Sequence, residues 1–233
     1  MARGATLSQL ISDLRDELRR ANSPSAGPDD EPSLRRTINH VYRTLYYAHD
    51  WSFLKHMFQA ITLNAGQRYY DLPDGLDMER IIEARVKWGS QFHPISRGIG
   101  FDEYNTYDPE DDERSSPASR WDIRYTGTTD QIEIWPLPDG SSQSLRLFGV
   151  YECNELVDEA DVCRLESEIV VLYAAAELAK AQDNKDADAK LELAKEMLRL
   201  VKIRSASGGE TGVQVGLGSA GKADNFRATV RVS

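Results

Sequence analysis

The sequence predicts an α+β protein that is mainly a bundle of about four helices, with a small antiparallel β unit inserted between them and an extended C-terminal arm. Apolar residues recur at helical spacing near both ends and alternate with a period of two in the middle third. After residue 204 the chain becomes rich in Gly, Ser and Ala. We therefore expect four segments: N-terminal helices at residues 1–56, a β insertion at 57–154, a C-terminal helical hairpin at 155–204 and a flexible arm at 205–233.

The N-terminal segment is expected to hold two helices. Thr6 and Gln9 have the spacing of a capping box and mark the start of the first helix. Its apolar face consists of Leu7, Leu10, Ile11, Leu14 and Leu18. Residues 23–32, SPSAGPDDEP, contain three prolines and are expected to form an exposed loop. A second helix is predicted from Ser33 to about Asp50. It is followed by an apolar plug made of Trp51, Phe53 and Leu54. A position in the core is favoured for this plug over a role in binding a partner.

From Met57 onward the apolar residues alternate as in strands with one buried face. A first hairpin is expected over residues 57–72, with its turn at 64–67. Residues 101–119 form an acidic, polar excursion between the later strands. Those strands are expected at residues 78–88, 91–96, 121–127, 131–138 and 144–153.

Helical periodicity returns near Asp161, and a break at residues 183–184 separates two antiparallel helices, the second running from Ala187 to about Arg204. Residues 205–225 have the composition of a flexible tether. The last residues, NFRATVRVS, again alternate, with an apolar row opposite a polar one. Because such a strand has no local partner, it is predicted to add to another subunit through Phe226, Arg227, Val230, Arg231 and Val232.

Charge and composition exclude several functional classes. The formal net charge is -10, which disfavours high-affinity nucleic-acid binding unless a local basic patch overrides it, and which permits an acidic wall past which DNA slides. Cys153 and Cys163 have no partners at metal-ligand spacing, so neither a disulfide framework nor a zinc site is expected. No apolar stretch approaches a membrane span or a secretory signal, which predicts a soluble protein made inside the cell.

The sequence contains no motif for nucleophilic catalysis or phosphate binding, so no enzyme activity, catalytic residue, metal or cofactor is expected. One acidic run can be interpreted in two ways. It can ligate calcium, or it can form a solvated, mobile loop, which is favoured because the glycine and the regular alternation of a calcium loop are absent. The run consists of Asp108, Glu110, Asp111, Asp112 and Glu113.

Two stretches carry a resemblance to a known family. The first stretch comprises residues 38–73, INHVYRTLYYAHDWSFLKHMFQAITLNAGQRYYDLP. It resembles the helix, the Asp-Trp-x-Phe-Leu plug and the following hairpin of the head-to-tail adaptor (connector, or head completion) proteins of tailed bacteriophages. Residues 121–151, with Ile132-Glu133-Ile134-Trp135-Pro136-Leu137-Pro138, are similar to the β segment that those proteins place before their long helix. The resemblance covers roughly residues 6 to 204.

The resemblance implies a structural virion protein at the neck, made in the host cytoplasm. Such adaptors form a ring, commonly of twelve copies, beneath the portal protein, and a stopper or tail nozzle protein attaches below. Their C-terminal arms commonly dock on the portal. Genomic double-stranded DNA passes through the channel without sequence-specific binding, and no membrane is involved. An acidic subunit suits this role, because an attractive lining would hold the DNA phosphates and slow their exit. In such a ring the acidic run at residues 108–113 can face the DNA channel.

Two other functions are compatible with the sequence. The first is an acidic protein-binding scaffold that captures a single partner with its β unit and does not form rings. A mass measurement in the presence of purified portal protein separates this alternative from the adaptor. The second, more distant, is a metal-assisted hydrolase that uses the acidic run, which a bound divalent metal would indicate.

Overall fold

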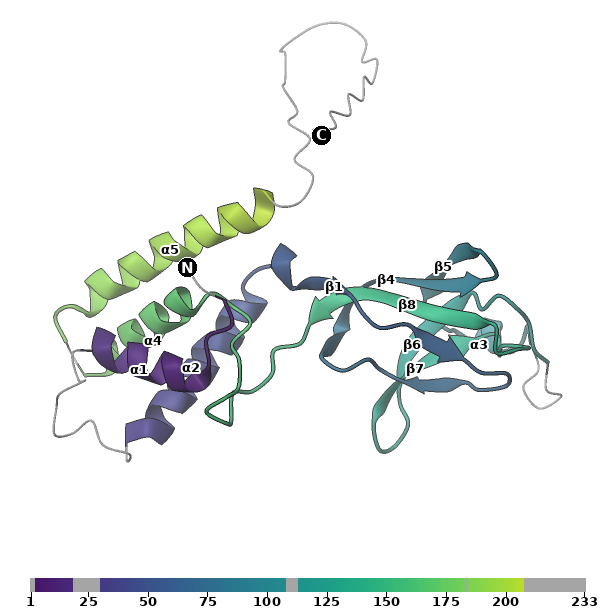
Figure 1. The fold of residues 1–233 in the computed structure, drawn as a ribbon, viewed down its shortest axis with the longest axis horizontal. Coiled ribbons are helices and arrows are strands. Elements are labelled where there is room, and N and C mark those ends of the chain that lie inside the picture. Colours follow the sequence, from purple (N-terminus) through teal and green to yellow (C-terminus); the bar gives the residue numbers. More distant parts are fainter. Residues whose placement is uncertain (1–2, 19–29, 108–112, 183, 208–233) are drawn as a thin grey trace, which may run out of the picture.

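In the computed structural model, residues 3–18, 30–107, 113–182 and 184–207 of the 233-residue chain are described. Helices gather at one end of an elongated molecule and strands at the other (Figure 1). The helical end contains α1 (Leu7–Glu17), α2 (Glu31–Tyr47), α4 (Ser167–Ala181) and α5 (Ala187–Ser207). The chain thus leaves the helices after α2, forms the strands, and returns to the helices for α4 and α5.

Helix α4 is the central element of the helical end, because it contacts α1, α2 and α5. A helix that is apolar on nearly all sides must be covered on nearly all sides. The buried residues of α4 match this position, and the alanines among them allow neighbouring helices to approach closely. They are Ile169, Val170, Val171, Leu172, Ala174, Ala175, Ala176 and Ala179.

The start of α1 has the capping box that the sequence predicts. The backbone N–H of Gln9 donates to the Thr6 hydroxyl (3.3 Å), and the backbone N–H of Thr6 donates to the Gln9 side chain (3.0 Å). Helix α2 begins at Glu31, ahead of the expected Ser33, because Pro32 fits the first turn of a helix, where its missing N–H costs nothing.

The strands form one sheet in the order β1-β8-β4-β5-β6-β7-β3, with β2 also pairing with β8. Every pairing is antiparallel except the short parallel pairing of β5 with β6. The short helix α3 (Phe101–Tyr104) lies between β5 and β6 in the chain. The strands are β1 (Lys55–Met57), β2 (Ile61–Leu63), β3 (Tyr69–Asp71), β4 (Leu76–Trp88), β5 (Gln91–Arg97), β6 (Arg120–Tyr125), β7 (Asp130–Trp135) and β8 (Gln143–Tyr151).

The expectation of a mainly helical bundle with a small antiparallel insertion is therefore wrong. Within the described residues, the strands form a mixed half-barrel, and five α-helices accompany it. The half-barrel has an apolar core of its own, separate from the core of the helices. This core is assembled from segments far apart in the chain, and local periodicity does not reveal that they pack together. It consists of Phe58, Leu63, Tyr70, Leu76, Ala84, Val86, Ile95, Ala118, Trp121, Ile132, Ile134, Leu145 and Leu147.

The expected hairpin over residues 57–72 is also absent. Strand β2 pairs with β8, whereas β3 pairs with β7 at the other end of the strand order. The turn between β2 and β3 consequently joins the two ends of the sheet. The hydroxyl of Tyr70 lies under this turn, where it accepts a hydrogen bond from the backbone N–H of Asn64 (3.0 Å).

The plug that follows α2 belongs to the core of the helical end, as favoured from the sequence. Trp51 is completely buried, and its indole N–H donates to the carbonyl of Leu45 (3.1 Å). Nearby, the hydroxyl of Tyr46 contacts Asp77 Oδ2 (2.7 Å) and the carbonyl of Tyr151 (2.8 Å). These contacts tie α2 to β4 and β8, so they connect the helical end to the half-barrel.

Candidate functional surfaces

The predicted arm residues Phe226, Arg227, Val230, Arg231 and Val232 lie outside the described part of the chain. The structure does describe the helix from which the arm departs. The last turn of α5 lies against the short helix η2 (Ser52–Leu54), at the junction between the helices and the half-barrel. Ser205 is buried there and contacts Ser52 through two hydrogen bonds, of 3.0 and 2.6 Å.

A buried carboxylate further fixes this junction. Glu166 is only 4% exposed and lies just before α4. Its two oxygens face Arg204 of α5 (3.3 Å) and Arg3 (3.5 Å). The guanidinium of Arg3 also lies 3.7 Å above the ring of Phe53. The N-terminal segment, η2, α4 and the end of α5 are thus held together at the place where the arm begins.

Of the acidic run, only Glu113 belongs to the described residues, and its side chain is exposed. Asp108, Glu110, Asp111 and Asp112 lie outside them. The run connects α3 to β6, and α3 lies at the end of the molecule away from the helices (Figure 1).

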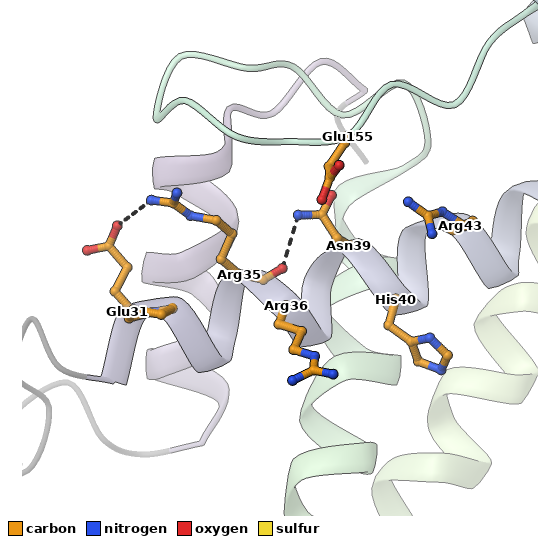
Figure 2. Close-up of a pocket in the computed structure, with 8 residues that line it drawn as sticks. Glu31, Arg35, Arg36, Asn39, His40, Arg43 and Glu155 are labelled. Carbon is orange, nitrogen blue, oxygen red and sulfur yellow. Dashed lines mark hydrogen bonds and ion pairs between the residues drawn. The ribbon is translucent and has the colours of Figure 1, made fainter.

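A basic groove of about 590 Å³ runs along the outside of α2 (Figure 2). The neighbouring loop is held against the helix by Asn39, whose side chain accepts from the backbone N–H of Leu156 and donates to its carbonyl, both at 2.9 Å. Arg35 is neutralised locally by Glu31 at 3.2 Å. The groove is lined by Glu31, Pro32, Arg35, Arg36, Asn39, His40, Arg43 and Glu155.

The exposed part of this groove is a stripe at helical spacing. Arg36, His40 and Arg43 follow each other along the outer face of α2, and Tyr47, which is 65% exposed, continues the row. Neither Arg36 nor Arg43 forms an ion pair with any residue that the structure describes. On a chain of net charge -10, this stripe is a local cationic surface that suits carboxylates or phosphates. We refer to these four residues as the α2 stripe.

An acidic groove of about 430 Å³ lies between α1 and α4. Its rim carries Asp13, Asp16 and Glu17 of α1 and Glu168 of α4, and Val171 and Leu172 are among its lining residues. Glu17 forms an ion pair with Lys190 of α5. Within the described residues, the other three carboxylates of the rim have no such partner. We refer to this feature as the α1/α4 groove.

The outer face of the sheet carries a third surface, which was not predicted from the sequence, like the α2 stripe and the α1/α4 groove. Exposed Met57, Phe92 and Phe148 lie around a shallow hollow of about 430 Å³. The guanidinium of Arg146 is 4.8 Å from the ring centre of Phe92. The available signal was Phe148, which occupies an outward position in the otherwise regular alternation of β8.

Two features common in catalytic centres, a metal-binding cluster and an activated thiol, are absent from the described residues. These residues include no group of three or more His, Cys, Asp and Glu side chains placed to hold a metal ion. The two thiols are free, and burial raises the pKa of Cys163 to about 12 and that of Cys153 to about 11. In the part of the chain that the structure covers, every helix is too short or too polar to cross a membrane.

Comparison with known proteins bears on the role of these surfaces. No curated protein matches the chain. The family model described as SU10 adaptor protein matches residues 5–215, which include both helical segments and the entire half-barrel. This family consists of structural proteins, and its members interact with phage portal or tail components. The chain therefore belongs to the SU10 adaptor protein family and is a phage protein of the head-tail adaptor type.

Proposed function

We propose that the chain forms a ring beneath the portal of a phage virion, links the capsid to the tail and surrounds the channel through which genomic DNA passes. The observation that carries this proposal is the family match over residues 5–215. The partners are the portal protein, a stopper or tail nozzle protein and further copies of the same chain, twelve being the expected number. The protein is then located at the neck of the virion.

The anchored end of α5 supports a docking role for the arm. An arm that binds a partner transmits force to the rest of the subunit only if the helix to which the arm is attached is fixed. Here the end of α5 is fixed by the contacts of Ser205 with Ser52 and of Arg204 with Glu166. We propose that residues 226–232 then add as a strand to the portal or to a neighbouring copy, with Phe226, Val230 and Val232 filling pockets.

Deletion of residues 220–233 tests this proposal. The truncated protein is expected to keep its thermal unfolding midpoint, because the deleted residues follow α5, the last described element, by more than ten positions in the sequence. It is expected to lose co-sedimentation with purified portal rings. A matched pair of variants refines the test: F226A/V230A/V232A removes the apolar row, and N225S/T229S leaves it intact. Normal joining of heads to tails by the truncated protein would contradict the proposal.

The acidic run at residues 108–113 is proposed to face the DNA channel, where repulsion keeps phosphates from binding to the wall. Replacing Asp108, Glu110, Asp111, Asp112 and Glu113 by the corresponding amides should leave assembly unchanged and slow DNA ejection from purified virions. Normal retention and ejection of DNA by that variant would exclude this role.

The single-partner scaffold would instead show a one-to-one complex with portal protein by native mass spectrometry.

A further inference from the structure

We propose that neighbouring copies of this chain contact each other through the α2 stripe of one copy and the α1/α4 groove of the next. This inference rests on the proposed ring, and it specifies which two surfaces form the contact between subunits. In this contact Arg36 and Arg43 face Asp13, Asp16 and Glu168 of the neighbour. The aromatic ring of Tyr47 packs on Val171 and Leu172 at the floor of the groove.

The first argument is charge. Several arginines of the described residues form ion pairs within the chain, as in Arg35–Glu31, Arg80–Asp50 and Arg199–Glu196. Arg36 and Arg43 do not, and neither do Asp13, Asp16 and Glu168, within the described residues. The two surfaces thus carry opposite charges that the described part of the isolated chain leaves without ion-pair partners. Complementary potentials of this kind select the partner and the register of an interface.

The second argument is position. The two surfaces lie on different sides of the helical end. On α1, Asp13, Asp16 and Glu17 face the groove with α4. Ser8, Ser12 and Arg15 lie around the other side of α1 and share a smaller groove with Glu31 at the start of α2. A twofold dimer requires one self-complementary patch, whereas a ring of more than two copies requires two different patches that match each other. The α2 stripe and the α1/α4 groove meet the second requirement.

The third argument is the apolar content of both surfaces. Tyr47 is 65% exposed at the end of the stripe, with its ring in an edge contact to buried Tyr46 (5.0 Å between ring centres). Val171 and Leu172 are each 7% exposed and line the acidic groove. An aromatic side chain that inserts between charged residues is the usual anchor of a protein interface. Phosphate binding by the stripe would leave both Tyr47 and the acidic groove without a role.

Charge reversal in the full-length chain tests the proposal. The variant R36E/R43E reverses the stripe, and the variant D13K/D16K reverses the groove. All four positions are exposed, so both variants are expected to unfold at the wild-type temperature. Each variant alone should show at least about a tenfold loss of ring assembly on portal rings, counted by native mass spectrometry and electron microscopy. An equimolar mixture of the two should recover assembly, because each reversed surface then meets its complement.

A matched control carries the same change of net charge elsewhere. The variant K180E/K185E reverses two exposed cations, one at the end of α4 and one in the turn that follows it, and changes the net charge by the same amount as R36E/R43E; it should assemble as the wild type does. A second readout is the variant Tyr47→Ala, which should weaken assembly at every salt concentration, whereas the effect of the charge reversals should shrink as salt screens them.

The outcomes separate the interface from the ring itself. If the wild type forms rings and either reversed variant forms them equally well, the proposed interface is excluded and the ring stands. If R36E/R43E forms rings but no longer retains DNA, the stripe binds phosphate and the interface is again excluded. If the wild type forms no ring on the portal, the proposed function and this inference fail together.

Discussion

Ser52 and Ser205 form a reciprocal contact between the plug that follows α2 and the last turn of α5. The hydroxyl of Ser205 accepts from the backbone N–H of Ser52 at 3.0 Å, and the hydroxyl of Ser52 donates to the carbonyl of Ser205 at 2.6 Å. The carbonyls of a last helical turn have no partner within their own helix. Ser52 supplies one, so the end of α5 is fixed to the junction from which the arm departs.

The variant Ser205→Ala should therefore destabilise this junction. It removes a buried acceptor and leaves the N–H of Ser52 without its partner, for an expected loss of about 1 kcal/mol in the free energy of unfolding. For a chain of this size the unfolding midpoint should fall by about 2–4 °C, as measured by differential scanning calorimetry. Ser12→Ala, at an exposed position of α1, is the matched control and should leave the midpoint within about a degree. Equal midpoints for the two variants would contradict the anchoring role.

A second prediction concerns Glu133, a completely buried carboxylate of β7. It faces Arg68 beside β3 (2.6 Å) and Arg124 of β6 (2.9 Å), and the hydroxyl of Tyr104 of α3 donates to it (2.8 Å). Removing one partner of a buried ion pair leaves the other charge uncompensated. Glu133→Gln should cost about 3 kcal/mol, at the low end of the range for such pairs, because Arg68 and Arg124 are 30% and 41% exposed.

The loss should be local as well as global. Amide hydrogen exchange should accelerate first in β3 and α3, because Glu133 connects both to the sheet. Glu83→Gln is the control, since the Glu83–Arg85 pair is about half exposed on both sides and should change stability by less than about 0.5 kcal/mol. If both substitutions had the same small effect, Glu133 would not be a structural link.

A third prediction concerns the two thiols and alkaline pH. Burial raises the pKa of Cys153 to about 11 and of Cys163 to about 12 in the folded protein, above the value of about 9 expected when they are unfolded. At pH 8 only about one in a thousand Cys153 side chains is then a thiolate, so Ellman's reagent should react slowly until guanidinium unfolds the chain. Because the folded pKa values are raised, stability is retained below about pH 9 and lost as the pH rises above it. Rapid labelling of the native protein at pH 8 would contradict this prediction.

Local features of the fold could be predicted from the sequence, because they depend on residues close together in the chain. Thr6 and Gln9 form the predicted capping box, and Trp51 occupies the predicted core position. The architecture of the sheet could not be predicted from the sequence. Whether β2 pairs with β3 or with β8 depends on how well its apolar face fits strands far away in the chain, and the parallel contact of β5 with β6 depends on the long connection through α3.

The α2 stripe, the α1/α4 groove and the hollow on the sheet were not predicted from the sequence, for different reasons. The α2 stripe was missed although a local signal was available: Arg36, His40 and Arg43 share the helix face opposite the core residues Leu34 and Ile38. The α1/α4 groove was not visible, because Asp13 and Glu168 come from opposite ends of the chain and meet only when α1 packs on α4. The network around Glu133 was missed for a related reason: alternation marked β7 as a strand but did not place its partners Arg68 and Tyr104.

The last prediction concerns the pairing of β4 with β8, where the register shifts between Leu76 and Glu83. Gly149 lies opposite this irregularity, and a Cβ atom there would be 2.6 Å from Leu76 Cδ1 and 3.3 Å from the carbonyl of Arg80. Leu76 is buried and has little room to move. Gly149→Ala should therefore cost about 1–3 kcal/mol through overpacking, measured by urea unfolding. Gly140→Ala, where no atom lies within 4 Å of the added carbon, should cost far less, and an equal cost would show that backbone effects rather than packing require Gly149.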